Sequence, residues 1–357
     1  MIRALLVCLI WSSSVFAADA RTLETRALWQ WLARPDPVPA LGGQWNGGVK
    51  SFGWLEQAEI MGRSPLIYGI EYYDYGPIER RLDARRDGER LIKEKFGAGG
   101  VSTVNDHMPN FVTGGNSWDR GGDALAAILP GGAAHRDYVA YLNRMASFFE
   151  QQVVNGISVP ILFRPFHEMN GDWFWWGDSK GGAQFVALWR FTWEYMQKTH
   201  GLRNLLWVWS PNIRSGWGRE DFERFWPGRE YVDVVALDGY DNRAEPDFAS
   251  ATFRSSYRAV AAIASGSKLP LAFSEVGFGQ GGQRISGFWV THFLPVLKRE
   301  YPALSYVLIW NYAHGPRAGT PAADSFRTLA EEHTWVLQGD VRGSDIYGPG
   351  FSRAQQR

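Results

Sequence analysis

Eight runs of apolar residues recur along the chain, and most end in polar residues or glycine before a segment with helical periodicity. They lie at 40–45, 65–72, 101–107, 159–168, 205–210, 232–240, 269–275 and 306–310. Several runs are continuous rather than alternating, as in Ile161-Leu162-Phe163, which is the pattern of parallel strands buried on both faces. Helical patterns stand between them, for example at 136–152, 183–199 and 253–265. We therefore predict an α/β protein in which strands and helices alternate.

Eight strand-and-helix units predict a single (β/α)8 TIM barrel with long loops. A doubly wound open sheet is the alternative. A barrel makes a further prediction, which is that its functional side chains follow the C-terminal ends of the strands. The polar residues that close the apolar runs are His107, Glu168, Asn212, Asp238, Tyr240, Glu275 and Asn311.

The first residues have the pattern of a secretory signal peptide. Arg3 gives a charged start, 4–11 form a short apolar run, and small residues surround Ala18. The run is shorter than the roughly 18 apolar residues that span a membrane. We predict a signal peptide at 1–18, a catalytic barrel at 19–350 and a C-terminal tail at 351–357, in a protein that is secreted or periplasmic. The only cysteine, Cys8, falls in the removed segment, so the mature chain has no disulfide and no thiolate.

Charge and composition narrow the class of partner. The chain has 37 basic and 37 acidic side chains, whereas a nucleic-acid-binding protein should carry a basic excess. Its 18 tryptophans exceed what a core needs, since each indole N–H must find a partner when buried. They indicate a cleft for flat, partly apolar ligands. We expect no nucleic-acid partner, no membrane partner and a monomer.

Two glutamates close the fourth and seventh apolar runs, Glu168 and Glu275. An unpaired buried charge is very costly, so either could be structural, for example Glu168 paired with Arg164. If both face one barrel mouth, they form the pair of carboxyls that glycosidic cleavage needs. A separation of about 5 Å gives retention, and a wider gap admits water and gives inversion.

Residues 164–177 read RPFHEMNGDWFWWG. This segment resembles the acid/base segment of glycoside hydrolase family 26, the β-mannanases, and is the most specific match of the chain to that family. Residues 273–277 (FSEVG) resemble its nucleophile strand, and weaker matches lie at 206–212, 232–240 and 309–311. The resemblance implies a (β/α)8 barrel, retaining hydrolysis, Glu168 as acid/base and Glu275 as nucleophile. It implies β-1,4-mannosidic substrates, which are mannan, galactomannan, glucomannan or manno-oligosaccharides, cut by endo action or by exo release of mannobiose.

The resemblance also implies substrate contacts. His107 would contact a glycone-side sugar, His167 would help orient the nucleophile near the −1 sugar, and Tyr240 would bond the nucleophile. Trp310 would lie under the −1 sugar, and Trp173 would line the +1 site.

Other substrate contacts rest on position along the chain. Trp173, Trp175 and Trp176 crowd one loop, so at least one should stack on sugar, and Trp217 is a second candidate. Asn311 stands where some family members carry an arginine that grips the −2 sugar. The full predicted substrate-binding set is His107, His167, Trp173, Trp176, Trp217, Tyr240, Trp310 and Asn311.

Three alternatives remain open at this point. The same scaffold could act on β-1,3-xylan or mixed-linkage β-glucan, or it could be a non-catalytic carbohydrate-binding barrel.

Residues 277–282 match G-x-G-x-x-G, but their late position favours a loop beside the cleft over nucleotide binding. His167-Glu168 is not a zinc motif, since Gly171 and not histidine lies four residues after His167. We therefore expect no metal and no cofactor.

Overall fold

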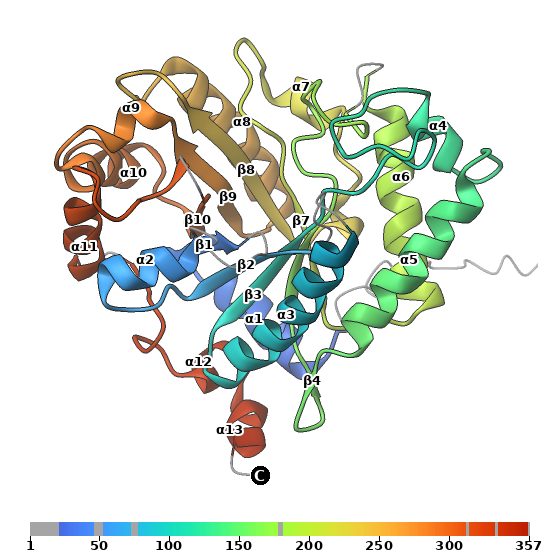
Figure 1. Cartoon of the computed structure of the whole chain (residues 1–357), viewed down its shortest axis with the longest axis horizontal. Coiled ribbons are helices and arrows are strands. Elements are labelled where there is room, and N and C mark those ends of the chain that lie inside the picture. Colours follow the sequence, from blue (N-terminus) through green and yellow to red (C-terminus); the bar gives the residue numbers. More distant parts are fainter. Residues whose placement is uncertain are drawn as a thin grey trace, which may run out of the picture.

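Eight parallel strands close into a barrel in the computed structural model, which describes residues 21–45, 53–72, 78–177, 181–311, 314–332 and 335–355 (Figure 1). The predicted signal peptide at 1–18 lies outside these residues. Around the barrel the strands follow the order β1-β10-β9-β8-β7-β6-β3-β2. They are β1 (Ala40–Trp45), β2 (Ile67–Glu71), β3 (Val101–Asn105), β6 (Ile161–Arg164), β7 (Leu205–Trp209), β8 (Val234–Asp241), β9 (Leu271–Phe278) and β10 (Leu304–Ile309). The predicted barrel is confirmed, and the open sheet is wrong.

Helices surround the barrel and cover the outer faces of its strands. They are α1 (Leu23–Leu32), α2 (Trp54–Met61), α3 (Ile78–Gly97), α4 (Ala124–Ile128), α5 (His135–Glu150), α6 (Ala183–Glu194), α7 (Arg219–Glu223), α8 (Ala251–Ser267), α9 (Gln280–Gln283), α10 (Leu294–Glu300), α11 (Ala323–Glu331), α12 (Gly343–Tyr347) and α13 (Pro349–Gln355). A turn of π-helix extends α6 at Tyr195–Thr199, and another precedes α10 at Trp289–Phe293. In the described part of the chain, no helix is long and apolar enough to cross a membrane.

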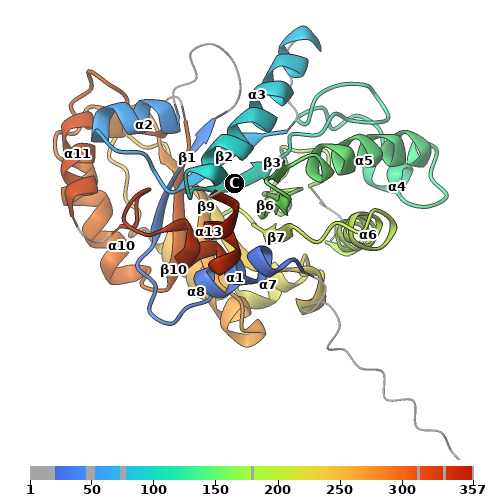
Figure 2. The same cartoon turned by 90° about the horizontal axis from the view of Figure 1, so that it is seen from below.

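The N-terminal end of the barrel is covered by segments from both ends of the chain. Figure 2 shows α1 and α13 across this end. Phe351 of α13 packs edge-on against Phe96, with ring centroids 5.1 Å apart, so α13 runs across the predicted boundary at residue 350. A small hairpin, β4 (Val153–Val154) with β5 (Ile157–Ser158), precedes β6 and was not predicted.

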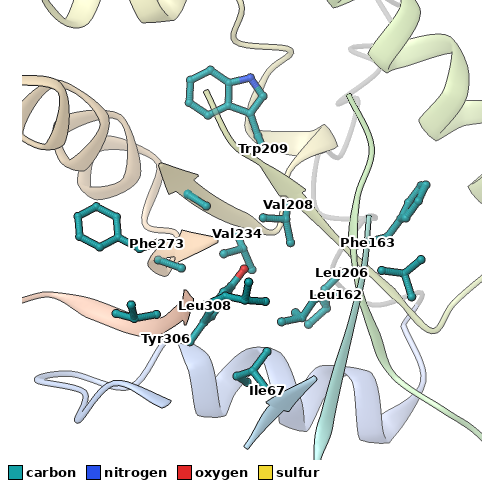
Figure 3. Close-up of a cluster of buried hydrophobic side chains, with 14 of the residues drawn as sticks. Ile67, Leu162, Phe163, Leu206, Val208, Trp209, Val234, Phe273, Tyr306 and Leu308 are labelled. Atoms are coloured by element: carbon teal, nitrogen blue, oxygen red, sulfur yellow. The ribbon is translucent and has the colours of Figure 1, made fainter. Parts of the chain in front are cut away.

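The core explains why these runs are continuously apolar. Successive side chains of a strand point to opposite faces, and here both faces are buried, one in the barrel and one under helices. Figure 3 shows Leu162, Tyr306 and Leu308 converging inside, whereas Phe163 and Phe273 point outward. Phe163 meets Phe149 of α5, with ring centroids 5.0 Å apart.

Toward the C-terminal ends of the strands the interior changes from apolar to polar. The side chains at this level include Gln44, Glu71, Asn105, Arg164, Asp238 and Glu275, all of them buried. A register shift in β9 helps to build this layer, because Leu237 pairs with Phe273 but Asp238 pairs with Glu275. Ser274 is thus an extra residue, and such a bulge re-aims the side chains beside it.

Candidate active site

The backbone after β6 is strained where it delivers Glu168. Phe166 and Glu168 have φ of 51° and 55°, a left-handed region that non-glycine residues adopt rarely and at a cost of about 1–3 kcal/mol. The amide of Glu168 donates to the carbonyl of Ser210 at 2.8 Å, which fixes the turn against the segment after β7. The strain thus lies at the residue that carries the predicted acid.

The Glu168 carboxyl is enclosed by donors and by negative charge. Asn212 Nδ2 donates to Oε1 at 2.5 Å, and Trp173 Nε1 donates to Oε2 at 2.7 Å. Burial raises the pKa of Glu168 well above its ordinary value, and the charges of Glu275 and Asp238 raise it further. This carboxyl therefore holds its proton toward neutral pH, as a general acid must.

Glu275 has the opposite surroundings, because cationic and phenolic donors hold it. Arg164 Nη2 donates to Oε2 at 2.6 Å, and the Tyr240 hydroxyl donates to Oε1. Arg164 Nη1 also donates to Asp238 at 2.8 Å, and Ser274 in the bulge donates to Asp238 at 2.6 Å. The suggested pairing of Arg164 with Glu168 is therefore wrong, since its ion pairs join it to Asp238 and Glu275.

The electrostatics of this cluster follow from burial. Burial opposes the charge of Arg164, but Asp238 and Glu275 outweigh it and raise the pKa of Arg164. Burial raises the pKa of Asp238 to about 7, while Arg164 lowers it. The site therefore contains carboxyls in unequal environments: neutral donors hold Glu168, whereas the Arg164 cation pairs with Asp238 and Glu275.

Two histidines meet beside these carboxyls. His107 Nε2 lies 3.2 Å from His167 Nε2, and both rings are buried. Burial lowers the pKa of His167 well below its ordinary value, and Arg164 and His107 lower it further. Trp310 is 9% exposed, and its ring lies 6.5 Å from that of His107 and 6.0 Å from the Arg164 guanidinium. The structure thus brings His107, His167 and Trp310 to the carboxyl cluster.

The tryptophans after β6 divide by exposure. Trp173 is partly exposed and bonded to Glu168. Trp176 is fully buried, stacks on Phe174 with ring centroids 4.4 Å apart, and donates Nε1 to the carbonyl of His167 at 2.8 Å. The prediction that Trp176 binds substrate is corrected, because its buried ring has no face for a sugar. It contacts the ring of His167 edge-on instead, with ring centroids 5.7 Å apart.

The other two predicted contacts lie in different settings. Trp217 is partly buried and stacks on Phe225, with ring centroids 5.9 Å apart, near α7. Nothing among its described contacts joins it to the carboxyls. Asn311 is 2% exposed, and neither polar atom of its side chain has a hydrogen-bond partner among the described residues. Such a buried amide is costly unless a ligand satisfies it.

Sequence reasoning missed Trp118, which lies in the loop after β3. It is 43% exposed and stacks on His107, with ring centroids 5.2 Å apart and planes 16° apart. Buried Asn110 organises the loop, since its Nδ2 donates to the carbonyls of Asp119 and Gly121. The available sign was a tryptophan in a glycine-rich segment just after His107. Within the described ranges, no cluster of three or more histidine, cysteine, aspartate or glutamate side chains could hold a metal ion.

Known proteins are similar to this chain in sequence and in fold. Residues 18–337 match the family model described as glycosyl hydrolase family 26. The chain is 30% identical over 381 residues to a mannan endo-1,4-beta-mannosidase of Bacillus subtilis, with 97% of each covered. It is 30% identical to mannan endo-1,4-beta-mannosidase A and B of Caldalkalibacillus mannanilyticus, where 91% of this chain spans 62% of that protein. A solved structure of a Cellulomonas fimi endo-beta-1,4-mannanase double mutant superposes with a TM-score of 0.79 at 29% identity, covering 92% of this chain and 78% of that one.

Proposed function

This chain belongs to glycosyl hydrolase family 26, and from that premise we propose that it is a retaining endo-β-mannanase acting on β-1,4-mannosidic linkages of mannan, galactomannan or glucomannan. The observation that carries the proposal is the unequal treatment of two carboxyls. Burial and negative charge raise the pKa of Glu168, whereas Glu275 accepts hydrogen bonds from Arg164 and Tyr240. One is suited to give a proton and the other to attack as a carboxylate.

The reaction takes two displacements. In the first, the Glu275 carboxylate attacks the anomeric carbon while Glu168 gives its proton to the leaving glycosidic oxygen, so that a glycosyl-enzyme forms. In the second, Glu168 takes a proton from water as that water attacks the anomeric carbon and releases Glu275. Two inversions restore the β configuration. Tyr240 and Arg164 hold the nucleophile in place through both steps.

Sugar contacts come from aromatic faces and from unpaired polar atoms. Trp310 and Trp118 flank His107, and Trp173 reaches the acid Glu168. Indole rings can cover the apolar C–H faces of sugar rings. The unpartnered amide of Asn311 is suited to a hydroxyl group. These residues would seat a neutral chain across the barrel mouth.

A reducing-sugar assay on galactomannan, glucomannan, xylans and lichenan tests the substrate. We expect turnover of the mannans, and Glu275→Ala is the matched inactive control. Preference for β-1,3-xylan or lichenan would overturn the choice of polymer, and binding without turnover would make the barrel a carbohydrate-binding protein. The ratio of viscosity loss to reducing ends distinguishes endo action from exo release of mannobiose.

Residues 1–18 are proposed to export the protein to the periplasm or the medium. A mature chain that begins at Asp19, found by N-terminal sequencing of the exported protein, would support this, whereas an uncleaved cytoplasmic chain would contradict it. We expect the exported enzyme to act as a monomer, which sedimentation velocity tests.

A further inference from the structure

We propose that Glu71 is a positioning residue that fixes which ring nitrogen carries the proton in His107 and, through it, in His167. Its effect on catalysis rests on the proposed function, but the protonation pattern itself does not. Glu71 ends β2 and is 3% exposed, and no step of the double displacement uses it.

Three donors converge on the Glu71 carboxylate. The amide of His107 donates to Oε1 at 2.8 Å, His107 Nδ1 lies 2.9 Å from Oε2, and Asn105 Nδ2 donates to Oε2. Asn105 is itself oriented, because Gln44 Nε2 donates to its Oδ1 at 2.8 Å. A carboxylate offers only acceptors, so His107 Nδ1 must carry a hydrogen.

The position of the hydrogen on His107 determines which nitrogen of His167 carries a hydrogen. His107 with its hydrogen on Nδ1 offers the lone pair of Nε2 to His167 Nε2, which lies 3.2 Å away. His167 must then donate from Nε2. Burial, Arg164 and His107 lower the pKa of His167, so this ring is neutral and its Nδ1 is an acceptor.

The last acceptor, Nδ1 of His167, is buried and has no hydrogen-bond partner among the described residues. An unsatisfied buried polar atom costs free energy, and His167 directly precedes the proposed acid Glu168 in the chain. We therefore assign Nδ1 of His167 as an acceptor for a hydroxyl group of the bound sugar, set up from a distance by Glu71.

Replacing the carboxylate by an amide should reverse the pattern. In Glu71→Gln, Oε1 still accepts from the amide of His107, and an NH2 group replaces Oε2. This NH2 group faces His107 Nδ1 and Asn105, whose side-chain amide turns so that its Oδ1 accepts. That nitrogen becomes the acceptor, Nε2 becomes the donor, and His167 must move its hydrogen to Nδ1. The matched control is Asp106→Asn. Asp106 is a neighbouring buried acid, and both of its oxygens accept from the Tyr141 hydroxyl at 2.9 Å.

Ring 15N NMR on histidine-labelled protein, assigned with His107→Gln and His167→Gln, measures the protonation directly. We expect hydrogen on Nδ1 of His107 and on Nε2 of His167 in the wild type and in Asp106→Asn, and the reverse in Glu71→Gln. A wild-type His107 with hydrogen on Nε2, alone or on both nitrogens, overturns the proposal even if Glu71→Gln does not fold.

Kinetics then tests the consequence. Loss of one matched hydrogen bond should lower kcat/KM on mannan by roughly tenfold in Glu71→Gln, and Asp106→Asn should stay within about twofold. Reversed rings with unchanged kcat/KM would overturn the link to catalysis. If the wild type cleaves no mannan, the proposed substrate fails while the ring assignment still stands or falls by NMR.

Discussion

Arg164 Nη2 lies 2.6 Å from Oε2 of Glu275. The same guanidinium reaches Asp238 through Nη1 at 2.8 Å, so one buried cation holds the proposed nucleophile and a second acid together. Arginine suits this task because its planar fork offers parallel donors to two acceptors at once. The position of Glu275 therefore depends on a residue of β6, across the barrel from β9.

Removing this cation should leave two buried carboxyls without a neutralising charge. Arg164→Met is expected to lower the free energy of unfolding by about 3–5 kcal/mol, measured by urea denaturation, and to remove activity. The control is Arg254→Met, whose partner Glu300 lies 3.4 Å away at the partly exposed surface. It should cost about 1 kcal/mol or less. Equal losses in the two variants would contradict the structural role of Arg164.

The Tyr240 hydroxyl should matter for rate more than for folding. Tyr240→Phe removes one donor from Glu275, and a hydrogen bond to a charged group is worth about 1.5–3 kcal/mol. We expect kcat/KM to fall by roughly 10- to 100-fold. Tyr138→Phe is the control, because its buried hydroxyl bonds Thr192 at 2.6 Å, away from the carboxyls. It should cost stability but leave kcat/KM unchanged, and a comparable rate loss would argue against a special role for Tyr240.

The pH dependence follows from the raised pKa of Glu168. The protonated form dominates below that pKa and declines as the pH rises through it, so kcat/KM should fall on the alkaline side. Glu168→Ala should lose about 10²–10⁴-fold on mannan and far less on an aryl mannoside with a good leaving group, where the alkaline fall should vanish.

A second variant should shift the alkaline fall of kcat/KM along the pH scale. The hydrogen bond from Asn212 lowers the pKa of Glu168, so Asn212→Ala should shift the alkaline fall to higher pH. A shift to lower pH, or an alkaline fall that persists in Glu168→Ala, would show that another group is the acid.

The two tryptophans Trp118 and Trp176 should separate binding from stability. Trp118→Ala removes an exposed ring above His107, so it should raise KM on manno-oligosaccharides with little change in melting temperature. Trp176→Ala removes a fully buried ring and should cost about 3–5 kcal/mol of unfolding free energy. Isothermal calorimetry and thermal melts distinguish the two, and the opposite assignment of effects would refute our division of these residues.

Much of the fold was visible in the sequence because parallel strands buried on both faces leave continuous apolar runs. The two carboxyls were visible for the same reason, since Glu168 and Glu275 interrupt such runs at their polar ends. The register of the barrel was not visible. The extra residue Ser274 in β9 leaves no mark in the hydrophobic pattern, yet it helps to aim Ser274 at Asp238 and Glu275 at Arg164.

Side-chain exposure in long loops was also beyond the sequence. Trp173 and Trp176 are near neighbours in one aromatic stretch, but only the folded loop shows that Phe174 covers the ring of Trp176. Trp118 lies in a loop without periodicity, and its place above His107 depends on hydrogen bonds around Asn110. Glu71 and His107 are 36 residues apart, and the parallel pairing of β2 with β3, in which Glu71 lies opposite Asn105, brings them into contact.

The anomer formed first from a manno-oligosaccharide, followed by proton NMR from the start of hydrolysis, tests the central claim most directly. Two successive displacements through Glu275, with Glu168 as acid and then base, predict that the β anomer appears first and mutarotates later. Initial release of the α anomer would contradict the account, because it would require water rather than Glu275 to attack the anomeric carbon.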